Sequence, residues 1–273
     1  MLAALLIHAF VDGYASNSGI KLDLATVELT KEAAPVDFHL TLAAGDAADI
    51  LYRHVYRASI SYKPNERLTL EGGIYPSHIG FEGFFTKDNW NYTRGWLAEL
   101  SPYYQTGLRG AYQFSKQWSG ELHVLNGWQL VDDNDRAKAI GAKIAYTGNR
   151  LSASFNTFDG PDNHHWRHFG DLVATWKATP KLSVAGSFDR GRQQQTNWQG
   201  IGVFGRYAID DRHAIAFRAE RFRDPGNRVS SEPTLGEATL TYEVQPRPNW
   251  IFKLEGRRDR STSLVVAGAV ATF

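Results

Sequence analysis

Apolar and polar residues alternate one by one along most of this chain. Within residues 68–75, Leu68, Leu70 and Ile74 share one face, whereas Thr69 and Glu71 share the other. The same alternation returns in residues 140–146, 182–189, 215–220, 237–244 and 250–255. Because successive side chains of a strand point to opposite faces, this period of two predicts strands with one apolar and one polar face.

Turn signals separate these runs, and they are of two kinds. Short turns occur at residues 63–66, 115–117, 147–150, 178–181, 209–212 and 245–249, and longer polar connections at 45–49, 131–136, 160–167, 192–197, 224–231 and 259–262. The two kinds alternate along the chain, as the two rims of an up-and-down barrel require. We therefore predict an all-β, single-domain antiparallel barrel over residues 1–273, with about sixteen strands of roughly 9–13 residues and fourteen strands as the alternative.

Residues 76–102 interrupt this rhythm with PSHIGFEGFFTKDNWNYTRGWLAELSP. By strand count the segment connects the fifth and sixth strands, and residues 93–100 could form one short helix with Trp96, Leu97 and Leu100 on one side. A long insert in a compact domain is usually functional or packed by its own side chains. We expect it to fold into the lumen as a constriction loop, with these candidate residues: Glu82, Asp88, Trp90, Tyr92, Arg94, Trp96 and Glu99.

Mean hydropathy is −0.38, which at first favours a soluble protein. No apolar run approaches the roughly 18 residues of a membrane-spanning helix. A transmembrane barrel, however, places its lipid-facing residues at every second position, and the average then stays polar. Aromatic residues near the ends of the runs and an apolar last strand ending in Phe273 favour the outer-membrane barrel over a soluble sandwich; the aromatic residues are Trp118, Tyr146, Trp176, Tyr207, Tyr242 and Trp250.

Charge and cysteine content exclude several classes of function. Lys and Arg number 30 against 29 Asp and Glu, and this balance argues against a nucleic-acid partner. The absence of Cys removes disulfide scaffolds, thiol nucleophiles and thiolate metal sites. Residues 1–10 are apolar but lack a preceding cationic residue and a clear cleavage site, so we expect the first strand to begin there and any export signal to be missing from this sequence.

Three segments carry a family resemblance: DNWNYTR at residues 88–94, PYYQTGLR at 102–109 and VLNGW at 124–128. Residues 159–161, 171–175, 221–225 and 257–260 extend it in the same order, so that it covers about residues 12–273. In these segments the chain resembles the β-barrel porin-2 family, also called OmpL-like. The resemblance implies a barrel in the bacterial outer membrane with pore activity and no established substrate.

The polar face of the predicted strands carries charges of both signs. The candidate pore-lining residues are Arg53, Arg57, Glu71, Arg109, Lys143, Arg206, Arg218, Glu220, Lys253, Glu255 and Arg257. If the basic group of Arg53, Arg57 and Arg109 faces the acidic residues of the 76–102 segment, a transverse field would select solutes. The alternative is that these charges pair with one another and plug the lumen.

Signals for metal binding and catalysis are weak. His164, His165 and His168 form a cluster in a polar loop, and residues 132–135 (DDND) offer oxygen ligands without the glycine and distal glutamate of a calcium loop. A catalytic pair would need a positioned Ser and His, and Ser119, Glu121 and His123 also fit a polar wall. We therefore expect no enzyme activity, no cofactor and no metal.

The sequence thus predicts an outer-membrane porin that lets small hydrophilic solutes or ions diffuse through a charged lumen. The alternative is a closed structural or partner-binding barrel without transport. Expected partners are outer-membrane lipid and lipopolysaccharide, and the barrel-assembly machinery, which would recognise the last strand with Phe273.

Overall fold

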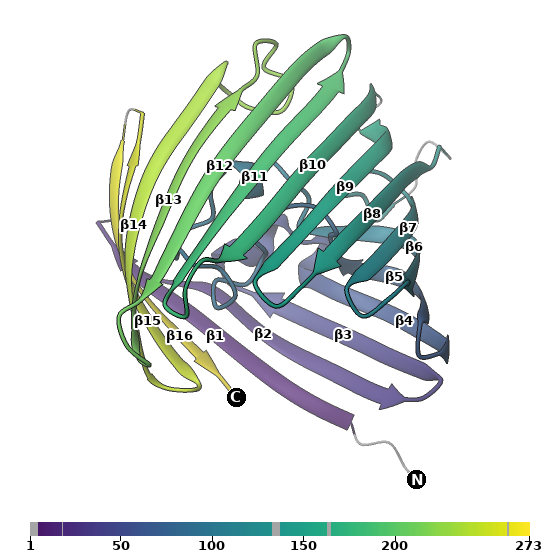
Figure 1. The fold of residues 1–273 in the computed structure, drawn as a ribbon, viewed down its shortest axis with the longest axis horizontal. Coiled ribbons are helices and arrows are strands. Elements are labelled where there is room, and N and C mark those ends of the chain that lie inside the picture. The colour runs from purple at the N-terminus through teal and green to yellow at the C-terminus, as the bar shows by residue number, and fades with distance from the viewer. Residues whose placement is uncertain (1–4, 18, 133–136, 163–164, 261) are drawn as a thin grey trace.

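The protein is described by a computed structural model that covers residues 5–17, 19–132, 137–162, 165–260 and 262–273. Within these residues, sixteen antiparallel strands form a closed barrel in which each strand pairs with its neighbours in sequence and β1 closes on β16 (Figure 1). The prediction of sixteen strands is confirmed, and the alternative of fourteen is wrong. Closure leaves no free sheet edge, which is what a membrane-spanning sheet requires.

The first eight strands are β1 (Leu5–Ser16), β2 (Gly19–Ala33), β3 (Val36–Ala44), β4 (Val55–Asn65), β5 (Leu68–Pro76), β6 (Tyr104–Gln113), β7 (Trp118–Leu125) and β8 (Ala139–Thr147). The second eight are β9 (Leu151–Asp162), β10 (His165–Lys177), β11 (Leu182–Gln193), β12 (Thr196–Ala208), β13 (His213–Arg223), β14 (Thr234–Arg247), β15 (Trp250–Asp259) and β16 (Ser263–Thr272). Two 3-10 turns, η1 (Asp46–Ile50) and η2 (Tyr52–His54), lie between β3 and β4, and one short helix, α1 (Trp96–Glu99), lies between β5 and β6.

The connections separate into two rims. Short turns join β2 to β3, β4 to β5 and the later even–odd pairs at one end, which we call the turn rim. The longer connections, after β3, β5, β7 and β13, lie at the other end, the loop rim, where two residues each separate β1 from β2, β9 from β10 and β11 from β12. The longer connections predicted at 160–167 and 192–197 are therefore wrong, because the strands extend through most of these residues. The first residue of β1 and the last residue of β16 both lie at the turn rim (Figure 1). There the backbone N–H of Phe273 donates to the carbonyl of Ala9 at 2.8 Å, and the N–H of Ala9 donates back at 3.0 Å.

The apolar face of the strands points outward. Leu108 and Leu122 are 66% and 68% exposed, whereas the inward-facing Glu71 and His123 are buried. Trp118, Trp176 and Tyr207 form part of an exposed aromatic belt near the turn rim, where Trp118 packs against Tyr146 at 5.1 Å between ring centroids. A soluble protein buries its apolar face, whereas a barrel wall between lipid and an aqueous lumen exposes it, as this barrel does. Among the described residues, no helix is long and apolar enough to cross a bilayer.

The segment between β5 and β6 comprises residues 77–103, one residue later at each end than predicted, and we call it the inner loop. It lies within the ring of strands (Figure 1). The predicted helix at 93–100 shortens to the single turn α1, which follows Gly95 without a side-chain cap.

Two hydrophobic clusters pack the inner loop against the inner wall. One contains Phe84, Ala98 and Tyr103 of the loop together with wall residues of β1, β2, β4 and β16. The other contains Ile79 and Leu97 with aromatic side chains that include Trp128, Phe158, Phe169, Trp198 and Phe222. The predicted apolar side of the helix is correct, because Trp96 and Leu100 pack on this second cluster beside Leu97. Apolar side chains therefore occupy two parts of the interior at the level of the loop.

Candidate functional site

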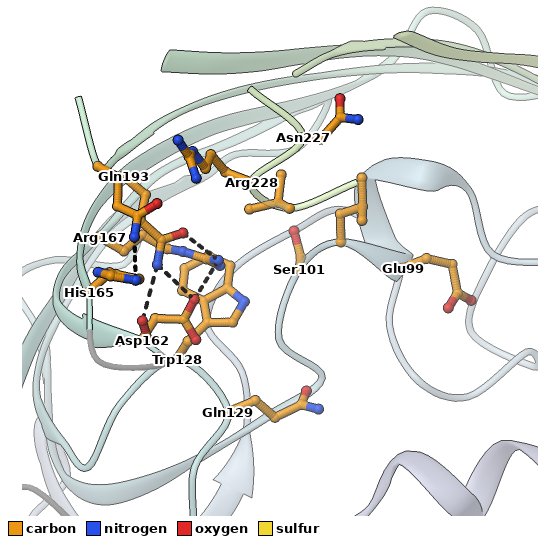
Figure 2. Close-up of a pocket in the computed structure, with 13 residues that line it drawn as sticks. Glu99, Ser101, Trp128, Gln129, Asp162, His165, Arg167, Gln193, Asn227 and Arg228 are labelled. Atoms are coloured by element: carbon orange, nitrogen blue, oxygen red, sulfur yellow. Dashed lines mark hydrogen bonds and ion pairs between the residues drawn. The ribbon is translucent and has the colours of Figure 1, made fainter. Parts of the chain in front are cut away.

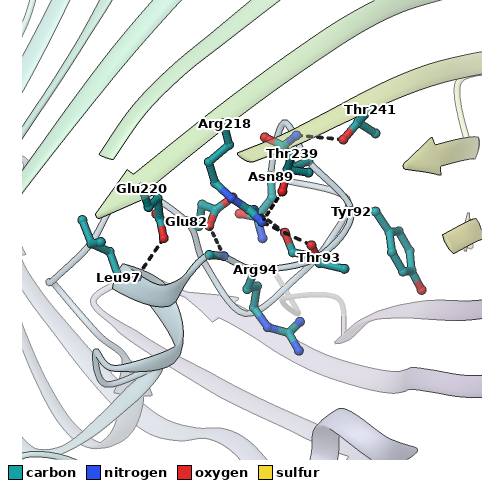
Figure 3. Close-up of polar contacts among 12 residues, drawn as sticks. Glu82, Asn89, Tyr92, Thr93, Arg94, Leu97, Arg218, Glu220, Thr239 and Thr241 are labelled. Carbon is teal, nitrogen blue, oxygen red and sulfur yellow. Dashed lines mark hydrogen bonds and ion pairs between the residues drawn. The ribbon is translucent and has the colours of Figure 1, made fainter. Parts of the chain in front are cut away.

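The centre of the candidate site is Arg218 on β13, whose side chain is fully buried between the wall and the inner loop (Figure 3). Its Nη1 group donates to Glu82 of the loop at 2.7 Å and to the Thr93 carbonyl, and its Nε and Nη2 groups donate to Glu237 on the neighbouring β14. Arg257 on β15 reaches the same Glu237 at 3.3 Å. Two carboxylates and two guanidinium groups thus share one buried network, and removal of one member would leave an uncompensated charge.

Lys253 on β15 binds the loop through main-chain atoms. Its ammonium group donates to the carbonyls of Thr86, Asn89 and Asn91 at 3.0, 2.6 and 3.4 Å. The ammonium also lies 3.5 Å from Glu243, so it joins three loop carbonyls to a wall carboxylate. Lys253 therefore fixes the path of residues 86–91.

Glu255 and Asp12 hold the next part of the loop. Glu255 accepts the backbone N–H groups of Tyr92 at 2.6 Å and Thr93 at 3.1 Å. Asp12 on β1 accepts the Tyr92 hydroxyl at 2.9 Å and the hydroxyl of Thr86. The loop is thus bonded to β15 on one side and to β1 on the other.

Glu220 on β13 contacts the first residues of α1. Its Oε2 atom accepts the Leu97 N–H at 3.1 Å. A Cβ atom at position 95 would lie 2.5 Å from the Glu220 carboxylate, so a larger residue there would displace this carboxylate from α1. Gly95 therefore allows the close contact between α1 and the wall.

The remaining predicted loop residues pair within the loop or with its neighbours. Asp88 pairs with Lys87 at 2.7 Å, and Glu99 with Arg94 at 3.1 Å. Trp90 packs edge-on against Phe81, and the ring of Trp96 lies below the guanidinium of Arg257 at 5.1 Å. Both tryptophan rings are thus engaged in loop packing.

A second charge group lies on β4 to β8. Glu71 is buried and accepts from Arg57 at 2.8 Å and from Arg109, while Arg109 also contacts Glu121 at 3.5 Å. The two arginine side chains remain 22% and 24% exposed, so they face space inside the barrel. Lys143 lies on the adjacent β8, half-buried, opposite Glu121 in the β7–β8 register. The expected opposition of Arg57 and Arg109 to loop carboxylates is wrong, because their partners belong to the wall.

Arg53 is not on the lumen wall, and its assignment as a lumen position is wrong. It lies in η2 at the loop rim, exposed, with φ of 49°, and stacks on Tyr52. The chain forms two 3-10 turns here before β4 begins at Val55, so the alternation of residues cannot be extended back to this position. Arg206, by contrast, faces inward on β12 and pairs with Glu243 at 2.7 Å.

We expect Glu71→Gln to shift ion selectivity toward anions. The substitution removes the carboxylate that neutralises both Arg57 and Arg109, whose partly exposed groups then attract anions. Reversal potentials across a salt gradient measure the shift. Asp211→Asn, which makes the same charge change on an exposed turn, should leave the potential unchanged; equal shifts in both variants would contradict the account.

His78 begins the inner loop and is buried against the wall. Its ring stacks on His123 at 4.1 Å and approaches Gln105 at 2.7 Å and the Thr157 carbonyl at 3.0 Å. Burial, together with the neighbouring His123, lowers the pKa of His78 to about 4. The ring is therefore neutral at neutral pH and adds no charge to this side of the interior.

The residues that suggested metal binding or catalysis make ordinary polar contacts in the structure. His168 pairs with Asp159, and His165 contacts Gln194. His164 and residues 133–135 lie outside the described part of the chain, and the described residues contain no group of three potential metal ligands. His123 contacts Glu121 at 3.2 Å, inside the charge group of β4 to β8.

A cavity of about 550 Å³ opens at the loop rim between the inner loop and the ends of β9 to β11 (Figure 2). At its base Arg167 lies 4.4 Å from the ring of Trp128 and 5.3 Å from that of Trp198. Asp162 pairs with Arg167 at 2.6 Å and accepts from Gln193. Trp128 and Trp198 belong to the second hydrophobic cluster, so the base of this cavity adjoins that cluster.

Sequence reasoning missed several residues that hold the loop. Asp12, Thr86, Asn91 and Thr241 all bond across the loop–wall contact, with Asn91 donating to Thr241 at 2.7 Å. The alternation in Phe10, Asp12 and Tyr14 marked an inward polar position. Its partner, however, lies 80 residues away, and no local pattern shows that distance.

Comparison with solved structures shows the fold. The chain is similar to OmpT, an outer membrane protein of Vibrio cholerae in its trimer form (TM-score 0.74, 10% identity, 100% of each chain covered). It is also similar to Pseudomonas putida OprB, with a TM-score of 0.70, 12% identity, and 99% of this chain and 94% of that chain covered. An anion-selective porin from Comamonas acidovorans is similar with a TM-score of 0.68, 12% identity, and 99% of this chain and 100% of that chain covered. No curated protein sequence matches the chain.

The family comparison extends over nearly the whole sequence. A model described as "Putative beta-barrel porin-2, OmpL-like" matches residues 9–269. The match agrees with the closed sixteen-stranded barrel and its outward apolar face, and it places the protein in the bacterial outer membrane. Membership of a porin family agrees with a membrane protein that passes small solutes and is not an enzyme. The chain belongs to the OmpL-like β-barrel porin-2 family.

Proposed function

We propose that this porin is a passive diffusion channel for small hydrophilic solutes or ions, with the inner loop as its constriction and with no catalytic activity. The observation that carries the proposal is the mixed-sign inner wall: Arg57, Arg109, Glu121 and Lys143 remain partly exposed inside a barrel whose outer face is apolar. Sixteen strands enclose enough space for an aqueous channel when side chains do not fill it. Selection would follow from charge and width, without turnover.

The proposed pore-lining group consists of Arg57, Glu71, Arg109 and Lys143 on β4 to β8, of Arg206 on β12, and of Arg218, Glu220, Lys253, Glu255 and Arg257 around the loop. In the last set, Arg218, Lys253 and Glu255 act by fixing the loop, because their polar atoms bond to it. The first set is the better candidate for selectivity, since Arg57, Arg109 and Lys143 keep contact with solvent.

One observation favours the second candidate, a closed barrel. The two hydrophobic clusters fill the interior on both sides of the loop and include fully buried side chains such as Tyr75, Leu24 and Leu125. Such a barrel would serve as a structural or partner-binding element. In either case we propose that the last strand, ending at Phe273, is recognised by the barrel-assembly machinery and that the loop rim contacts lipopolysaccharide.

Liposome swelling separates the two candidates. Vesicles that contain the folded protein should swell in isosmotic small neutral polyols and at lower rates as the solute becomes larger, because a constriction excludes by size. Vesicles with heat-denatured protein give the background. Swelling at the background rate for every solute would reject the channel and favour the closed barrel.

A further inference from the structure

Two cavities lie one above the other along the same strands of the barrel. The upper cavity, of about 460 Å³, opens toward the loop rim and is lined by Tyr14, Ser16, Asp23, Arg94 and Leu264 among others. The lower cavity, of about 510 Å³, opens toward the turn rim and is lined by His8, Phe10, Glu28, Phe85 and Val270 among others. Both therefore follow β1, β2 and β16, at opposite ends.

A thin polar layer separates these cavities. On β1 the residue between Phe10 and Tyr14 that faces inward is Asp12, which is fully buried. Above it the Tyr92 hydroxyl donates to Asp12 at 2.9 Å, and Thr86 donates to the other carboxylate oxygen. In Figure 3 the Tyr92 side chain points away from the Arg218 network. The separation is thus made by two loop side chains, the Asp12 carboxylate and Leu24, which lies opposite Asp12 in the β1–β2 register and is fully buried.

Gly268 on β16 allows Tyr92 to close this layer. A Cβ atom at position 268 would lie 2.2 Å from the Tyr92 ring, so the ring rests directly on the strand backbone. Below this layer the path borders the first hydrophobic cluster through Phe10 and Val270. The other loop–wall contacts are ion networks or belong to the second cluster. Once one ring has moved, water and ions cross a polar layer more readily than they cross a packed apolar cluster.

Carboxylates along this path lack cationic partners. Asp23 of the upper cavity, Asp12 of the layer and Glu28 of the lower cavity face the interior on β1 and β2. Ion pairs identified in the described part of the chain include none of the three. The cations that line the two cavities pair with other carboxylates: Arg94 with Glu99, Arg257 with Asp259 and Lys87 with Asp88. Carboxylates without a direct ion pair along the path favour cations over anions.

We propose that ions cross this barrel along β1, β2 and β16, that the Tyr92 ring closes the path over Gly268, and that the carboxylate of Asp12 selects cations there. The proposal rests on the channel function proposed above and names its route. It differs from a route beside Arg57 and Arg109, which ends toward the loop rim at the buried layer of Tyr75, Gln105 and His123.

Single-channel recordings on the full chain test the route. Tyr92→Ala should raise conductance several-fold, Tyr92→Phe should raise it less because the ring remains, and Phe114→Ala on the outer face should leave it unchanged. Asp12→Asn in the Tyr92→Ala background should reduce the preference for cations. Equal conductance of Tyr92→Ala and the unaltered protein would overturn the proposal.

The absence of native Cys allows a second, independent test. Ser16→Cys places a thiol in the upper cavity, and Gln129→Cys places one in the cavity of Figure 2, at the same rim. A bulky charged thiol reagent should block current through Ser16→Cys and not through Gln129→Cys. The reverse pattern, or block in neither variant, would overturn the route.

A further recording distinguishes failure of the route from failure of the channel. If a variant lacking residues 81–99 conducts while Tyr92→Ala does not differ from the unaltered protein, the route is wrong and the channel function stands. If the unaltered protein, Tyr92→Ala and the loop deletion all remain silent in the folded state, both proposals are wrong.

Discussion

Deletion of residues 81–99 should produce a barrel with several-fold higher conductance. The deletion removes Glu82, Tyr92 and α1, together with Phe84, Ala98 and Leu97 of the two hydrophobic clusters. Pro76 and Tyr104 face each other in the β5–β6 register, so the remaining residues can join these strands at the loop rim. The closed ladder of backbone hydrogen bonds does not depend on the loop, and planar-bilayer recording measures the gain.

A replacement of the same residues by a Gly/Ser linker of equal length is the matched control. This linker keeps the chain length but lacks the contacts with Arg218, Lys253 and Asp12, so it should also raise conductance, with larger current noise. Heat-modifiable migration in gels checks that each barrel is folded. Unchanged conductance in both folded variants would reject the inner loop as the constriction.

Arg218→Met should release the inner loop while leaving the barrel closed. The substitution leaves Glu82 and Glu237 buried without their main cationic partner, and breaking a buried pair in this way costs about 3–5 kcal/mol. The loop can escape this cost by moving Glu82 into water. We therefore expect faster trypsin cleavage after Lys87 and Arg94, and a more variable current.

Arg206→Met is the matched control for this substitution. Arg206 also faces inward and pairs with a carboxylate, Glu243, but it is 34% exposed and makes no identified contact with the loop. Partly exposed pairs contribute about 0–1 kcal/mol, so the loop should stay in place. If cleavage at Lys87 and Arg94 is equally slow in both variants, the Arg218 network does not hold the loop.

The alternation of residues was sufficient to predict the barrel. A period of two assigns each side chain to lipid or lumen, as Leu70 outside and Glu71 inside illustrate, and two classes of turn assign the rims. The inner loop was found by the same means, because residues 76–102 lack that period. Such patterns are local, and they identify elements and faces.

The contacts that build the site are not local. Glu82 and Arg218 lie 136 residues apart, and Asn91 and Thr241 lie 150 apart, so their pairing depends on barrel shear and on the course of the loop. The sequence therefore showed charged inward positions but not their partners, and it wrongly placed Arg57 and Arg109 opposite the loop acids. Arg53 was misplaced for a related reason, since a positive φ at a 3-10 turn ends the alternation before β4.

The central claim is that the folded barrel conducts through a path narrowed by the inner loop. Single-channel recording of the purified, unaltered protein in a planar bilayer tests it most directly. The account predicts discrete conductance steps that are smaller than those of the variant lacking residues 81–99. A folded protein that gives no steps, together with a silent deletion variant, would contradict it.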